Sequence, residues 1–448
     1  MVQNMTSGKP IGFIIRFAIP LFIGNIFQQI YNFADTALVG QYVGTDALAS
    51  VGASGSTTFF LISLLMGLTS GASIIIAQAY GRSERDQMCR AVGSLYTICT
   101  LLSIVLSLVG VCFTPFILRL LNTPPNLMND AILYLRIIFI GIPALGLYNA
   151  GSAVMRSLGN SVTPLVILIL SSFLNIGLDV LFILPLQKGI AGAAAATVIS
   201  QVFSAVITNL YVYIKRSKLF LTGTRLFQKD PAMLREVFRI GLPTAFQSSL
   251  ISLGGMTVQG LINTYGDMTI AAYTAAAKID SIAIQFVVAV GMSISVFTGQ
   301  NIGSGHIERI KICVRDTLKL QIVMCTVIAA VIVIFRYPLV GFFLKEEAAE
   351  AIDIGCEYIT IICIAYISAG IMQTFLNVIR GAGDVRFSTY AGLLEVAVRI
   401  VFAYLLSGLM HSQTGIWIAT PIAWISACIF TVLRYRTGKW MHSALRNT

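Results

Sequence analysis

Long apolar runs separated by short polar stretches recur along the whole chain. An α-helix needs about 20 apolar residues to cross the roughly 30 Å hydrocarbon core of a bilayer, and each run reaches or approaches that length. The pattern predicts twelve spans, at residues 11–38, 47–79, 92–115, 131–154, 162–185, 190–214, 236–262, 269–298, 316–337, 351–378, 388–409 and 416–434. The first run is longer than the apolar part of a signal peptide and lacks a cleavage pattern, so we expect it to be a span.

The composition supports this all-α membrane class. Of the 448 residues 56% are hydrophobic and 11% charged, with a mean hydropathy of +0.84. The net charge of +11 comes from basic residues clustered in the segments between spans, so it does not indicate a nucleic-acid partner. The eight cysteines form no C-x-x-C pair and no span contains a histidine, so we expect neither a disulfide framework nor a cofactor.

The basic residues also predict the orientation. An even number of spans puts both termini on one side, and Lys and Arg are enriched on the cytoplasmic side of membrane proteins. Twenty-three of them fall on the terminal side and five on the other. We therefore expect a multi-pass protein of the cytoplasmic (inner) membrane with both termini in the cytoplasm.

The two halves of the chain resemble each other at a nearly constant offset, the one that relates Pro20 to Pro243. Four ordered matches carry the resemblance: "RFAIP" with "RIGLP", "AQAYG" with "GQNIG", "MRSLGN" with "IRGAGD", and "GIAGAAAATVIS" with "GIWIATPIAWIS". The longest hydrophilic stretch lies between spans six and seven. We expect a six-helix lobe at residues 1–222 and another at 223–448, related by an internal pseudo-two-fold repeat, with sites within or between them.

Acids inside spans are the strongest candidates for function, because each costs roughly 2.5–3.5 kcal/mol at mid-membrane and so faces a partner or a cavity. In the second half, Glu395 has Arg399 one helical turn later, and Asp280 has Lys278 in the same span, so both can be neutralised locally. Whether these second-half groups are structural or functional stays open.

In the first half, by contrast, Asp35 and Asp179 have no cation in their own spans. Their repeat positions carry Thr257 or Val258, and Ala403. The repeat scaffold therefore does not require these two carboxylates.

Other polar residues accompany the two acids. Asn25, Gln28, Asn32 and Asp35 form one stripe on the first span, and Tyr31 lies one turn before Asp35, where a hydrogen bond is feasible. In span five, Asn175 is one turn from Asp179, and Thr197 of span six supplies a hydroxyl.

Carboxylates, an amide and a hydroxyl make an all-oxygen set suited to a hard cation such as Na⁺, or to a proton. We predict cation or proton coupling at Asp35, Asp179, Asn175 and Thr197, with Tyr31, Asn32, Gln28 and Asn149 as substrate contacts or supports. Pro20 interrupts the hydrogen-bond ladder of the first span and is a candidate hinge.

The sequence resembles the multidrug and toxic compound extrusion (MATE) family of cation-coupled transporters over nearly its whole length. The resemblance is carried by the twelve spans, the duplicated motifs, "YNFADTALVG" in span one, and "NIGLDVLFI" followed by "GIAGAAAAT" in spans five and six. The acid of span one and the N-x-x-x-D of span five resemble the DinF-like branch, in which the proposed cation site lies in the first lobe. Span seven has no acid at the place where the NorM-type branch has one.

This resemblance implies a MATE-like fold and a multidrug efflux antiporter that exports organic, cationic and amphipathic compounds in exchange for H⁺ or Na⁺. The expected partners are drug-like molecules and the lipid bilayer, and the expected state is a monomer. The alternative is a flippase for lipid-linked saccharides or another lipid. An intramembrane enzyme is disfavoured, since no nucleophile with a base and no metal cluster is evident.

Overall fold

Twelve helices of at least 22 residues dominate the computed structural model, which describes residues 4–120, 123–219, 221–222, 230–344 and 349–441. They are α1 (Pro10–Leu38), α2 (Thr45–Gly81), α3 (Arg85–Leu120), α4 (Pro125–Ser157), α5 (Val162–Ile183), α6 (Gly189–Ile214), α7 (Pro231–Ile262), α8 (Asp267–Gly303), α9 (Ile307–Ile334), α11 (Ala349–Gly381), α12 (Val385–Met410) and α13 (Thr414–Arg436). Three short helices join them: η1 (Val39–Val43), η2 (Asn263–Tyr265) and α10 (Arg336–Gly341).

Each predicted span coincides with one long helix, which confirms the all-α membrane class. Within the described residues, eleven helices are long and apolar enough to cross a membrane. The helix outside that set is α7, whose middle carries Gln247, Ser248 and Ser249. The short helices were not predicted, because apolar periodicity cannot resolve a single turn.

The chain forms two compact units, and two helices take part in both. Unit 1 contains residues 1–4 and 23–245, and unit 2 contains residues 5–22 and 246–448. The boundaries fall inside α1, just after Phe22, and inside α7, just after Ala245. The division into six-helix lobes at residues 1–222 and 223–448 stays a prediction.

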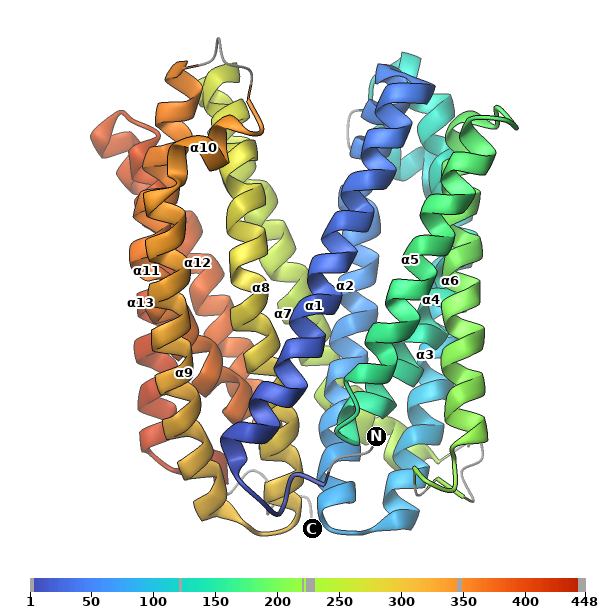
Figure 1. Cartoon of the computed structure of the whole chain (residues 1–448), viewed down its shortest axis with the longest axis vertical. Helices are drawn as coiled ribbons and strands as arrows, with labels where there is room; N and C mark the ends of the chain where they lie inside the picture. Colours follow the sequence, from blue (N-terminus) through green and yellow to red (C-terminus); the bar gives the residue numbers. More distant parts are fainter. Residues whose placement is uncertain (1–3, 121–122, 220, 223–229, 345–348, 442–448) are drawn as a thin grey trace. The chain divides into compact units, whose positions relative to one another are not determined.

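Unit 1 is built around α4, which packs against α2, α3 and α6, while α5 packs against α6 (Figure 1). One core cluster joins α3 and α4 through residues such as Leu118, Leu135 and Phe139, all fully buried. Small residues bring these helices close together. A side chain at Gly151 of α4 would overlap Thr208 of α6, and close approach of this kind is how membrane helices gain packing energy.

Unit 2 repeats the same arrangement around α11, which packs against α8, α9 and α13, while α12 packs against α13 (Figure 1). Trp417, only 1% exposed, stacks on Tyr273 and meets Tyr358 edge-on in one core cluster. A second cluster holds the first part of α1 through Ile14 and Phe17.

The chain just before α1 is also fixed within unit 2. The Met5 N–H donates to Gln300 Oε1 (3.0 Å), and the Met5 carbonyl accepts from Asn301 Nδ2 and Arg309 Nη2 (3.2 Å each). The segment before α1 and the first part of α1 are therefore both held in unit 2.

The ends of the helices repeat as faithfully as their packing. Positive φ occurs at equivalent places in the two halves, and the offset in residue number is nearly the same for every pair. The four pairs are Gly44 and Gly266, Ser83 and Gly305, Gly159 and Gly383, and Gln187 and His411. After α4, Gly159 N–H donates to Arg156 and Asn160 N–H to Met155, the paired bonds of a Schellman cap, and the same pattern follows α11. The repeat inferred from sequence is therefore present in the backbone.

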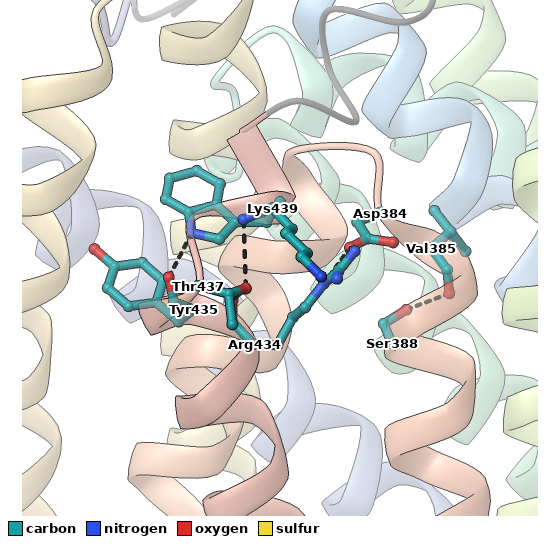
Figure 2. Close-up of polar contacts among 8 residues, drawn as sticks. Asp384, Val385, Ser388, Arg434, Tyr435, Thr437 and Lys439 are labelled. Atoms are coloured by element: carbon teal, nitrogen blue, oxygen red, sulfur yellow. Dashed lines mark hydrogen bonds and ion pairs between the residues drawn. The ribbon is translucent and has the colours of Figure 1, made fainter.

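One ion pair distinguishes the second half at such a cap. Arg434, at the end of α13, donates from Nε and Nη2 to Asp384 Oδ2 (2.9 and 2.6 Å) immediately before α12, as Figure 2 shows. In the first half the equivalent residue, Asn160, instead bonds locally with Thr163. The Arg434–Asp384 ion pair therefore links α13 to the start of α12, whereas Asn160 at the start of α5 bonds within its own segment.

The cap glycines give a stability prediction. Gly383 has φ +97°, where a side chain costs about 1–2 kcal/mol, so Gly383→Ala should lower the thermal midpoint of the purified protein, followed by tryptophan fluorescence. Gly408→Ala is the matched control, because Gly408 of α12 has an ordinary helical φ and open space surrounds a side chain there, so this substitution should not lower the midpoint. Equal losses in the two variants would contradict the explanation.

Candidate functional site

Asp35 lies in the last turn but one of α1, just before the helix changes geometry. The π-helical turn η1 follows, and Gly44 with φ +123° ends it before α2. Val39, one turn after Asp35 and fully buried, packs with residues of α4, α5 and α6, including Ile138, Ile183 and Ala194. This apolar contact fixes the end of α1 beside α5 and α6, and so places the Asp35 carboxylate.

Asn175 joins Asp179 to helix α6. With its amide oriented so that donors face acceptors, Asn175 Nδ2 donates to Asp179 Oδ2 (3.0 Å), and its oxygen accepts from the Thr197 backbone N–H (3.2 Å). Asp179 is fully buried, Asn175 is 1% exposed and Thr197 is 8% exposed. The contact from a side chain of α5 to the backbone of α6 therefore ties the two helices together beside the Asp179 carboxyl.

The Asp35 and Asp179 carboxyl groups lie within hydrogen-bonding distance of each other. One oxygen of each, Asp35 Oδ1 and Asp179 Oδ1, is buried and has no hydrogen-bond donor among the described residues. Two adjacent carboxylates repel each other unless a proton or a cation lies between them. The pair therefore has both the negative charge and the free oxygens that a small cation or a proton would satisfy.

Two tyrosines complete the site. The Tyr31 hydroxyl is hydrogen-bonded to the Thr197 hydroxyl, which itself donates to the Ala193 carbonyl (3.1 Å). Tyr31 thus reaches across to α6, whereas a bond to Asp35 was expected. Tyr134 of α4, 9% exposed, lies near both carboxylates and Tyr31.

Sequence reasoning missed Tyr134, because one tyrosine in an apolar run carries no periodic signal. The sequence signal that was available is that the repeat position of Tyr134 also carries a tyrosine, Tyr358. In the structure Tyr358 lies near the intramembrane Asp280.

The remaining predicted residues lie apart from this constellation or outside its contacts. Gln28 and Asn32 of α1 keep part of their surface accessible, so the polar stripe of α1 is only partly buried. Asn149 is buried, but its Nδ2 donates to the Leu145 carbonyl of its own helix (2.9 Å). Pro20 lies inside α1, shortly before the boundary between the units. The structure thus brings together Asp35, Asp179, Asn175, Thr197 and Tyr31.

A model of the MatE family matches residues 20–181 and 243–405, once in each half of the chain. The chain belongs to this family. It is 31% identical to "Probable multidrug resistance protein YoeA" of Bacillus subtilis (strain 168), over 91% of this chain and 89% of that one. It is 30% identical to "Probable multidrug resistance protein YpnP" of the same strain, over 98% and 97%.

The fold is shared with a solved structure described as "Crystal structure of MATE in complex with MaL6", with a TM-score of 0.92, 23% identity, and coverage of 100% and 99% of the two chains. The MATE fold expected from the sequence is therefore confirmed. Membership of the family also makes the protein a membrane transporter and not an enzyme.

The amide bridge predicts a measurable cost of removal. Asn175→Ala removes the hydrogen bonds from Asn175 to Asp179 Oδ2 and to the Thr197 backbone in a buried site, so we expect a loss of about 1–3 kcal/mol in stability, observed as a lower thermal midpoint. Asn149→Ala, which removes a bond within a single helix, should lower it less. If the two variants unfold together, Asn175 does not bridge the helices energetically.

Proposed function

We propose that this transporter is a multidrug efflux antiporter of the cytoplasmic membrane, driven by a cation that binds between Asp35 and Asp179. The observation that carries the proposal is the pair of adjacent carboxyl groups, each with one buried oxygen that has no hydrogen-bond donor among the described residues. Relatives named as multidrug resistance proteins support the substrate class. Both termini are proposed to be cytoplasmic, from the distribution of Lys and Arg.

The available ligands suit either Na⁺ or a proton. The two carboxylates, the Thr197 hydroxyl and the Asn175 amide oxygen are all hard oxygen donors, although the amide oxygen is engaged with the Thr197 N–H. A proton would need only the two aspartates. Either cation reduces the negative charge of the pair, and this change in charge is what a coupled conformational change can use.

We propose that the chain follows the DinF-like plan, with its coupling site in the first half. Residues 241–261 of α7 carry no acidic side chain, and the repeat positions of Asp35 and Asp179 carry no carboxylate. The proposed substrates are organic cations of amphipathic character. When the coupling ion leaves the two carboxyl groups, the lobe is negatively charged again, and this charge favours binding of a positively charged substrate.

Helix α1 is suited to transmit the binding event. Its last turns carry Asp35 within unit 1, while its first part, with Ile14 and Phe17, belongs to the core of unit 2. Pro20 lacks the N–H that would continue the helix ladder, so bending near it costs less than elsewhere. Cation and drug favour different states of this helix, so each lowers the affinity for the other.

The driving force is adequate in principle. An inward concentration gradient of the coupling ion supplies about 1.4 kcal/mol for each tenfold ratio, and this term remains when an organic cation leaves in exchange for one inorganic cation and no net charge crosses the membrane.

The first test removes the negative charges. In proteoliposomes with an imposed Na⁺ gradient, and separately a pH gradient, Asp35→Asn and Asp179→Asn should lose gradient-driven dye efflux. In the wild type, the cation should change the affinity for the dye by a factor of about 5–150. In the variants this factor should fall to about one, because a neutral amide needs no compensating cation. The gradient that drives the wild type identifies the coupling ion.

Asp86→Asn is the matched control, since Asp86 belongs to an exposed ion pair with Arg90 and should leave efflux unchanged. Normal efflux by both site variants at normal protein levels would reject the assignment of the coupling site.

The second test concerns the hinge. Pro20→Ala restores a backbone donor to α1 and should stiffen it, so turnover should fall while Na⁺ or proton binding at Asp35 and Asp179 is retained. Pro243→Ala, at the repeat position in α7, tests whether the effect belongs to α1. Unchanged turnover in Pro20→Ala would exclude Pro20 as the hinge.

A further inference from the structure

A second buried cluster of charges lies in unit 2 and has no part in the proposed coupling. Arg399 Nη2 donates to Glu395 Oε1 (2.5 Å) on α12, which confirms the pair expected from their spacing. Asp280 of α8 accepts a hydrogen bond from the Tyr366 hydroxyl of α11 (2.7 Å). Arg399 lies close enough to Asp280 for their charges to attract. The Arg399 guanidinium therefore interacts with two carboxylates, those of Glu395 and Asp280.

The surroundings of this cluster are apolar and aromatic. Glu395 is 8% exposed, and the Arg399 Nε is buried without an acceptor among the described residues. Tyr273 and Tyr358 lie near both Asp280 and Arg399. The Lys278 ammonium, whose residue is close to Asp280 in sequence, lies over the Phe343 ring. The positive charge of Arg399 is among those that act on Asp280.

The internal repeat places Arg399 at the position of Asn175. Helices α5 and α12 are flanked by equivalent positive-φ residues, Gly159 and Gly383 before them and Gln187 and His411 after them. The step in residue number from Gly159 to Gly383 is also the step from Asn175 to Arg399. Arg399 therefore occupies the position in α12 that Asn175 occupies in α5.

Other members of the two clusters also correspond. Tyr134 on α4 and Tyr358 on α11 are separated by this same step in residue number, as are the first residues and the last residues of the two helices. Each tyrosine lies beside an intramembrane aspartate: Tyr134 beside Asp35 and Asp179 in unit 1, and Tyr358 beside Asp280 in unit 2. The acids come from different positions, but each set contacts or lies near a tyrosine and a polar residue that occupy equivalent positions in the repeat.

We propose that Arg399 is a tethered cation: its guanidinium occupies, in unit 2, the place that corresponds to the exchangeable cation site of unit 1. Without that guanidinium, Glu395, Asp280 and the Tyr366 hydroxyl form an all-oxygen site for Na⁺ or a proton. The charge of the second site is then constant through the transport cycle, and ion exchange is confined to the first half.

The comparison with unit 1 rests on the proposed function, but the vacant site created by removal of Arg399 does not. A gain of cation binding can be measured whether or not Asp35 and Asp179 couple transport. The two ideas can therefore fail separately.

The experiment measures cations bound to the full-length protein in detergent. Binding of radiolabelled Na⁺ is measured at constant ionic strength with choline chloride, and proton uptake is measured with a pH indicator. Arg399→Gln should bind an additional Na⁺ or proton relative to the wild type, and the gain should persist in an Asp35→Asn/Asp179→Asn background. No gain of either ion would overturn the proposal.

Three controls separate this result from a general loss of charge. Arg399→Lys keeps a tethered cation and should show no gain. Glu395→Gln/Arg399→Gln removes both members of the ion pair and should lose most of the gain. Lys311→Gln removes an exposed cation that pairs with Glu308, and it should bind the same number of ions as the wild type.

Arg399→Asn, which installs the first-half residue at its repeat position, is the second variant in case Arg399→Gln does not fold. If neither variant accumulates, while Arg399→Lys and Glu395→Gln/Arg399→Gln do, the guanidinium is a structural counter-ion that no free cation replaces, and the proposal is rejected. Recovery of either neutral variant only in Na⁺ or at low pH would support it.

Discussion

Two carboxyl groups that meet inside an apolar bundle impose the main constraint on this structure. Asp35 and Asp179 reach each other from α1 and α5, and each has a buried oxygen without a donor among the residues that the structure describes. Isolated charges of this kind are expensive within a membrane, so the arrangement is stable only when something positive reduces the repulsion. The Asn175 amide and the apolar contact of Val39 hold the two acids in this costly position, and the proposed coupling depends on that arrangement.

Helix α1 connects the candidate site in unit 1 to the core of unit 2. One continuous helix contributes Ile14 and Phe17 to the core of unit 2 and Asp35 to the site of unit 1. The segment before it is fixed by Gln300, Asn301 and Arg309, all within unit 2. A change in the forces on Asp35 therefore acts on a helix whose other end is anchored in a different compact unit, and Pro20 lies in that anchored part, shortly before the boundary.

The sequence allowed the fold to be predicted closely, because membrane helices are defined by long apolar runs and a bilayer permits few alternatives. The repeat was visible for a similar reason: helix caps such as Gly159 and Gly383 need a particular backbone geometry and so leave matched motifs. The site was predicted in part. Asp35, Asp179, Asn175 and Thr197 were evident because polar groups in lipid need partners, whereas Tyr134 was indistinguishable from an ordinary packing residue. The partner of Tyr31 proved to be Thr197, a residue of another helix, and helical spacing says nothing of contacts between helices. The passage of α1 from one unit to the other depends on tertiary packing, which the repeat boundary at residue 222 did not reveal.

The asymmetry between the two halves follows from one difference in electrostatics. A duplicated scaffold would by default present two equivalent places for buried polar groups, and both halves do surround that place with carboxylates and a tyrosine. The second half supplies its own guanidinium, covalently attached and always charged, so its charge cannot change with ion concentration. The first half has an amide in the same register, and in the proposed scheme its positive charge comes from solution. In the proposed scheme, therefore, a lobe that responds to ions and a lobe of constant charge differ in few side chains, while the helices that carry those side chains keep the same arrangement.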